Sequence, residues 1–220
     1  MPQPVSPGQA HVFALGEGMR QLRVPEGLAS QQRLWQLAQR LQNPRWQLVL
    51  GVYHLAIRFD PLRDSGDAVA GMLLEAWEVS TPAELSSLRR HAIPVSYGGA
   101  AGPDLAELAQ ATGLSQAEVI ERHAAPEYRV YCLGFLPGFA YLGGLDPQLT
   151  CARRATPRQV VPAGSVGIGG AQTGIYPQAA PGGWQLIGRT VVPLFDPQAT
   201  PAARLQPGDI VQFVPTVSHG

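Results

Sequence analysis

The sequence predicts an α+β protein in two parts: a small α/β sandwich over residues 1–88, followed by a β-barrel over residues 89–220. Three observations support this prediction. Hydrophobic residues make up 45% of the chain and the formal net charge is zero, so a core can form. The first 80 residues alternate strand-like and helix-like segments in the order typical of a two-layer sandwich. After Tyr128, short β-type runs alternate with Gly/Pro turns, which is typical of a closed barrel.

The N-terminal segments follow hydrophobic periodicity and turn residues. We expect strands over 11–16, 19–24 and 46–61, the last as one or two strands bent near Gly51, and a helix over about 66–79. Another helix is expected between Ser30, whose hydroxyl can cap its start, and Asn43-Pro44, which stops it. The boundary between the two parts is expected near residues 80–92.

The first segment of the second part is expected to form a strand over 91–99 and then two helices. The first helix should end at Gly113, and the second should begin with a capping box from Ser115 to Glu118. This pair resembles a DNA-binding helix-turn-helix, but the second helix carries Glu118 and Glu121 against a single Arg122. Phosphates would repel such a face, so we expect two packed helices and no nucleic-acid partner.

The uncharged stretch from Val161 to Trp184 could be a linker, a phosphate cradle or a barrel wall. A flexible linker would not carry so many Val, Ile, Tyr and Trp residues. The barrel accounts for both features, because apolar side chains fill its interior and glycines allow bends and close backbone approach. Ser165 lies in a sequence resembling a nucleophile elbow, but no helix start follows, so we expect it in a strand or turn.

Composition limits the chemistry, because all sixteen basic Lys/Arg residues are arginine. A Schiff-base lysine or a Walker A lysine is therefore excluded. Bound anions must be held by arginine, and Arg153, Arg154 and Arg158 gather within six positions of a Pro-rich loop. Such a loop can hold a carboxylate or phosphate, or it can simply be solvated, and both interpretations stay open.

Cysteine and histidine spacing predicts no metal site. Cys132 and Cys151 match no metal motif, and Cys132 is expected to be a buried thiol. His123 lies near the apolar face of its helix, where a hydrogen-bonded core residue is the commoner role. The chain opens without a recognisable signal peptide and has no bilayer-length apolar run, so we expect a cytoplasmic protein with no membrane partner.

Long motifs then become recognisable. They are HAIPVSYGG, GPDLAELA, YRVYCLGFLPGFAYLGGLDPQL, RRATPR, VPAGSVGIGGAQTGIYPQAAPGGWQLIGRT, LFDP and LQPGDIVQFVP. This set resembles the family of the B-type subunits of 5-oxoprolinase, which includes the kinase inhibitor KipI and proteins labelled allophanate hydrolase subunit 1. It is also similar to half of the carboxyltransferase region of urea carboxylase. The resemblance covers residues 91–215 and extends more loosely over residues 11–80.

The resemblance implies a cyclophilin-like barrel and one component of an enzyme that cleaves 5-oxo-L-proline to L-glutamate with ATP. It implies two partners, a homologous-barrel subunit of the KipA type and a third oxoprolinase subunit, and a small anionic substrate. ATP is used by the complex, and we expect this chain alone to be inactive.

Motif position and residue chemistry give candidate site residues. Catalytic candidates are Arg153, Arg154 and Gln172; substrate-binding candidates are Arg158, Thr173, Tyr176, Phe139, Trp184 and His123.

Two alternatives remain at this point. A KipI-like protein would dock on a sensor histidine kinase, and the aromatic segment Gly134–Gly144 could supply an apolar groove for it. A biotin-dependent carboxyltransferase half would need a biotin carboxylase partner.

Overall fold

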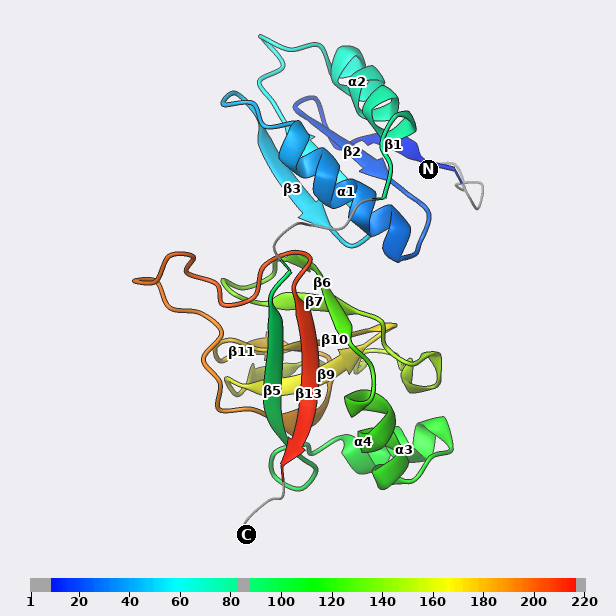
Figure 1. Ribbon diagram of the computed structural model, residues 1–220, viewed down its shortest axis with the longest axis vertical. Coiled ribbons are helices and arrows are strands. Elements are labelled where there is room, and N and C mark those ends of the chain that lie inside the picture. The colour runs from blue at the N-terminus through cyan, green and yellow to red at the C-terminus, as the bar shows by residue number, and fades with distance from the viewer. Residues whose placement is uncertain (1–8, 83–87, 217–220) are drawn as a thin grey trace. The chain divides into compact units, whose positions relative to one another are not determined.

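The computed structural model describes residues 9–82 and 88–216, in two compact units that divide between residues 87 and 88 (Figure 1). The sequence-based boundary was placed after residue 88. Each unit has its own buried cluster of apolar side chains. In the described residues, no helix has the length and apolar character needed to span a bilayer.

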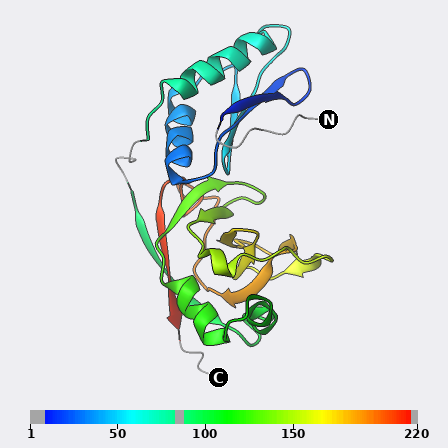
Figure 2. The same cartoon turned by 90° about the vertical axis from the view of Figure 1, so that its right-hand side faces the viewer.

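The N-terminal unit is a four-stranded antiparallel sheet with two helices. Its elements are β1 (His11–Ala14), β2 (Met19–Arg23), α1 (Leu28–Arg40), β3 (Gln47–Gly51), β4 (His54–Arg58) and α2 (Gly66–Glu78), with strand order β1-β2-β4-β3. The two helices pack on one face of the sheet and share a buried cluster with it (Figure 2). This is the predicted two-layer sandwich.

The predicted cap at Ser30 is wrong. The N-cap position of helix α1 is Gly27, three residues earlier, with φ at 126° and no side-chain cap, and the helix begins at Leu28. Glycine reaches this backbone conformation without steric cost, so the chain enters the helix there, and Ser30 lies inside the first turn. A buried glutamine, Gln31, fixes the helix to the β3–β4 turn: its amide donates to the Gly51 carbonyl at 3.2 Å and accepts from the Tyr53 N–H at 2.9 Å.

The C-terminal unit is a closed barrel of seven strands, in the order β10-β7-β6-β13-β5-β12-β9. The strands are β5 (Arg90–Tyr97), β6 (Tyr128–Leu133), β7 (Ala140–Gly143), β9 (Ser165–Gly169), β10 (Gln172–Ile175), β12 (Gln185–Arg189) and β13 (Ile210–Thr216). Neighbouring strands are antiparallel except β5 and β13, which run parallel and side by side (Figure 1). The other elements are α3 (Leu105–Thr112), α4 (Gln116–Ala124), the 3-10 turn η1 (Pro147–Leu149), β8 (Arg158–Val161) and β11 (Ala180–Gly182).

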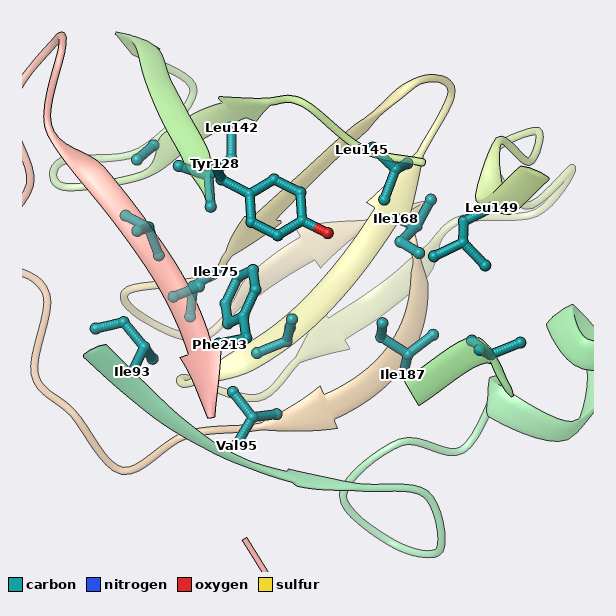
Figure 3. Packing of buried hydrophobic residues seen from close by; sticks show 14 of the residues in the cluster. Ile93, Val95, Tyr128, Leu142, Leu145, Leu149, Ile168, Ile175, Ile187 and Phe213 are labelled. Carbon is teal, nitrogen blue, oxygen red and sulfur yellow. The ribbon is translucent and has the colours of Figure 1, made fainter. Parts of the chain in front are cut away.

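The interior of the barrel is filled by side chains from its strands. Figure 3 shows Tyr128, Ile175, Phe213 and Val95 pointing into the space between the strands (Figure 3). The barrel was predicted from the alternation of short strands and turns, and this is confirmed. Sequence patterns do not identify the short strands β7 and β11, because they hold only four and three residues in segments rich in Gly and Pro.

The local predictions for α3 and α4 are confirmed. Gly113 takes a left-handed conformation with φ at 70°, and the Leu114 N–H donates to the Ala109 carbonyl at 3.0 Å. The capping box is complete: the Glu118 N–H donates to Ser115 Oγ, and the Glu118 carboxylate accepts from the Ser115 N–H at 2.8 Å. The two helices pack on each other, and α4 packs on β13.

Candidate functional site

A second apolar cluster lies in the barrel unit, apart from the barrel interior. Its buried members are Phe139, Val161, Tyr176, Trp184 and Leu186, with Tyr141 packed against it. The rings meet edge to face: the Phe139 centroid lies 5.3 Å from Tyr176, 5.4 Å from Trp184 and 5.0 Å from Tyr141. We call these six residues the aromatic floor.

Glycines on β9 and β10 create the slot in which Trp184 lies. A Cβ atom at Gly169 would stand 2.5 Å from Trp184 Nε1, and one at Gly174 would stand 2.8 Å from the Ala140 carbonyl oxygen and 3.1 Å from the Trp184 ring. Real Cβ atoms essentially never come as near as the contacts at 2.5 and 2.8 Å. The Gly-rich, uncharged stretch is therefore a barrel wall whose missing side chains admit a large ring.

Arg153 lies against the aromatic floor. Its guanidinium carbon is 5.9 Å from the Trp184 ring centroid, within the range of a cation–π contact. Burial raises the pKa of Tyr141 and of Tyr176, while the positive charge of Arg153 acts in the opposite direction on the pKa of both hydroxyls. Among the described residues, no carboxylate forms a salt bridge with Arg153, which leaves its charge available to an anion.

Arg154 and Arg158 converge on one buried carboxylate, that of Asp104. Asp104 Oδ1 accepts from Arg154 Nη1 at 3.2 Å and from Arg158 Nη2 at 2.6 Å. Asp104 is 3% exposed, whereas the arginine side chains are 31% and 25% exposed. The exposed Glu107 lies 3.5 Å from Arg154 and adds a weaker contact. The segment over 153–158, which we call the arginine loop, is therefore anchored to Asp104 at the start of α3.

Each of these two arginines keeps one buried donor without a partner in the described part of the chain. The atoms are Arg154 Nε and Arg158 Nη1. A buried N–H that makes no hydrogen bond costs about 1–3 kcal/mol. The pair therefore gains by donating to an oxygen that reaches it, whether from water or from a bound acid.

The structure brings together six of the nine residues singled out from the sequence: Arg153, Arg154, Arg158, Phe139, Tyr176 and Trp184. Gln172 opens β10 opposite Gly169 and is half-buried. Thr173 and His123 lie elsewhere, fully buried in the barrel interior.

His123 and Thr173 form a hydrogen-bonded chain inside the barrel. Thr173 donates to the Gly167 carbonyl at 3.0 Å, so it accepts from His123 Nε2 at 2.9 Å, and His123 Nδ1 accepts from the Tyr97 hydroxyl at 2.7 Å. Burial lowers the pKa of His123 to about 3, so the ring is neutral. The Phe213 ring stacks on it at 4.5 Å. These contacts make His123 a packed core residue at a distance from solvent.

Sequence reasoning missed two residues at this site. Asp104 directly precedes a helix, where an aspartate ordinarily caps the first turn, yet its side chain makes no cap hydrogen bond because it faces the arginines. Phe135 is 59% exposed, has φ at 69°, and its ring contacts Phe139 and Tyr176 edge to face at 5.5 and 6.3 Å. A left-handed backbone at a bulky residue is uncommon and marks a position worth testing.

A cavity of about 470 Å³ also lies in the barrel unit, beside the loop over 193–204. Two of its lining residues, Arg89 and His91, already contact Asp209 Oδ2 at 3.0 and 2.9 Å. Asp209 also accepts from the Gln206 N–H at 3.0 Å. These contacts tie the start of β5 to the loop before β13, which is a structural role.

Comparison with known proteins defines the class first. The family model described as "Carboxyltransferase domain, subdomain C and D" matches residues 11–205. The Kluyveromyces lactis urea carboxylase structure shares the fold, with a TM-score of 0.74 at 19% identity over 98% of this chain and 23% of that one. The fold is thus that of a carboxyltransferase-type domain.

The particular family follows from closer relatives. The chain is 49% identical over 212 residues to the B-type subunit of 5-oxoprolinase from Escherichia coli O157:H7, covering 94% of this chain and 96% of that protein. It therefore belongs to the family of 5-oxoprolinase B-type subunits. The chain is also similar to the crystal structure of TTHA0988, with a TM-score of 0.73 and 35% sequence identity. The matched region is 96% of this chain but only 40% of the TTHA0988 chain.

Proposed function

We propose that this chain is part of an ATP-dependent 5-oxoprolinase, which cleaves 5-oxo-L-proline to L-glutamate, and that it acts with a homologous-barrel partner of the KipA type and a third subunit. The observation that carries this proposal is the placement of three arginines around the aromatic floor: Arg153 contacts Trp184, and Arg154 and Arg158 contact Asp104, which is hydrogen-bonded to Leu186 of the floor. Family membership supplies the choice of reaction. A small cyclic acid matches a site that combines positive charge with aromatic surface.

The substrate dictates what the site must do. 5-Oxoproline is a five-membered lactam with one carboxylate. Phosphorylation of the lactam oxygen by ATP releases ADP and activates the ring carbon. One water then adds to this carbon, and the C–N bond breaks to give the free amine and an acyl phosphate, which a second water hydrolyses to L-glutamate and phosphate. Arg154 and Arg158 bind the carboxylate, since paired guanidinium groups suit its two oxygens. Arg153 stabilises negative charge that develops during ring opening.

Gln172 and Tyr176 have a lesser part in this proposal. Gln172 would orient the lactam by hydrogen bonding, and Tyr176 would support the arginines from the aromatic floor. We propose no substrate contact for Thr173 and His123, because both are buried in the barrel interior and hydrogen-bonded to each other.

Partner subunits are part of the proposal because the chain has no lysine to form a Walker A phosphate site. ATP would then be held mainly by the partners. Support comes from TTHA0988, in which the matching region is a minor part of a longer chain. The cytoplasmic location expected from the sequence stays a prediction.

Reconstitution tests this function. The chain is purified alone and after co-expression with candidate partners encoded beside it, and glutamate release from 5-oxo-L-proline is measured with and without ATP. We expect release only from the full set and only with ATP. Full activity of the isolated chain, or inactivity of the complete set, would contradict the proposal.

A second candidate is favoured by the matching family description, that of a carboxyltransferase domain. In that function the arginines would bind a carboxyl group carried on biotin. The same reconstituted complex distinguishes the two: a carboxyltransferase would exchange labelled bicarbonate when given a biotin carboxylase partner, whereas an oxoprolinase would not.

A further inference from the structure

Asp104 is fixed to strand β12 by both its backbone and its side chain. Its N–H donates to the Leu186 carbonyl at 2.9 Å, and its Oδ2 accepts from the Leu186 N–H at 2.7 Å. Its carbonyl accepts the first hydrogen bond of α3, from the Leu108 N–H at 2.9 Å. The remaining oxygen, Oδ1, is the one that both Arg154 and Arg158 approach. A carboxylate held by these contacts is a rigid reference point for the two arginines.

The buried charges around Asp104 do not balance. Two guanidinium groups meet one buried carboxylate, and the second carboxylate, Glu107, is 68% exposed and lies 3.5 Å from Arg154, so solvent screens most of its charge. The unpartnered buried donors, Arg154 Nε and Arg158 Nη1, belong to different arginines. One carboxylate with two oxygens could accept from both and would restore the charge balance.

We propose that Asp104 is a positioning residue that holds Arg154 and Arg158 as a pair for the carboxylate of the substrate. The identity of that substrate rests on the proposed function, but the pairing rests on the geometry alone. Asp104 acts through the arginines and does not touch the substrate. Orientation matters because an arginine on a flexible loop loses rotamer freedom on binding, whereas one already fixed has less to lose.

Two other roles for Asp104 give different results. A counter-charge that competes with the substrate would weaken binding, so removing its charge would lower KM. If Asp104 were purely structural, replacing it would lower the melting temperature and the amount of active enzyme but would leave KM unchanged. Positioning predicts a raised KM even though the site becomes more positive.

The experiment compares variants in the reconstituted complex. Asp104→Asn removes the charge at constant size, and Asp104→Glu keeps the charge but displaces it by one methylene. We expect each to raise KM for 5-oxo-L-proline about tenfold or more, with a smaller effect on kcat. A lower KM in Asp104→Asn, or an unchanged KM in both variants, would overturn the proposal.

Asp146→Asn is the matched control. Asp146 also accepts from one arginine, Arg122 at 2.9 Å, and from one backbone N–H, that of Gln148 at 2.9 Å, but it makes no contact with the arginine loop among the described residues. We expect this variant to leave KM unchanged. Melting temperatures of all variants show which of them are folded, and Asp104→Glu keeps the test decisive if Asp104→Asn does not fold.

A second readout separates this inference from the proposed function. The Nε–Hε NMR signals of Arg154 and Arg158 in the isolated chain are followed during titration with 5-oxo-L-proline, and with acetate as a bare carboxylate. Saturable shifts in the wild type that are absent in Asp104→Asn support positioning even if the complex lacks oxoprolinase activity. Identical shifts in both proteins, or no shift in the wild type, count against it whatever the complex does.

Discussion

At the scale of single residues, buried polar groups have two roles in this chain: some belong to the packed core, and others hold the arginines of the candidate site. Asp104 and His123 are both buried, but Asp104 is surrounded by cations and His123 by rings and hydroxyls. Burial disfavours a charged imidazole, and no carboxylate in the described residues pairs with His123 to offset this. The ring therefore links stability to pH.

We predict that the free energy of unfolding decreases as pH falls below about 6.5, the ordinary pKa of histidine. The unfolded chain binds a proton there, while the folded chain resists until its pKa of about 3. The slope is about 1.4 kcal/mol per pH unit, or about 2 kcal/mol between pH 6.5 and pH 5. Urea denaturation of wild type and His123→Gln over this range measures it. Equal pH dependence of the two proteins would refute the assignment.

The sequence supported local inferences best at this scale. Gly113 and the Ser115–Glu118 box were predictable because each interaction spans only a few residues. Asp104 was missed because its partners lie 50 and 54 residues away, and because an aspartate before a helix suggests a cap. The arginines were found as candidates, but their spacing could not reveal that two of them share a carboxylate.

At the scale of elements, β9 and β10 act as a pair that accommodates Trp184. Their glycines remove side chains where the indole lies, and the indole in turn packs against Phe139 and supports Arg153. Strand geometry and the site are thus connected through one ring. The glycines were expected to allow close backbone approach, but the ring that uses the space could be identified only from the structure.

We predict that Gly169→Ala disrupts this arrangement, because the added Cβ would collide with Trp184. Overpacking of this kind typically costs about 1–3 kcal/mol. The expected result is a lower melting temperature and altered Trp fluorescence. Gly71→Ala, in α2, is the control, because a Cβ there meets no atom within 4 Å. Equal stability of Gly169→Ala and wild type would show that Trp184 is not confined as described.

At the scale of the whole molecule, the sequence yielded the two-part architecture and the barrel, since strand length, turn spacing and helix periodicity are local patterns. The order of the strands around the closed barrel could not be predicted, because β13 pairs in parallel with β5, a strand from the opposite end of the barrel unit's sequence. The arginine loop and the aromatic floor both belong to the barrel unit. The central claim is therefore that the arginine loop and the aromatic floor together bind 5-oxo-L-proline.

The most direct test is KM for 5-oxo-L-proline in the reconstituted complex carrying Arg158→Gln, compared with Arg129→Gln on β6. Binding of the substrate carboxylate by the arginine pair predicts at least about a tenfold rise in KM for Arg158→Gln and none for Arg129→Gln. Equal KM values for both variants and the wild type would contradict the account.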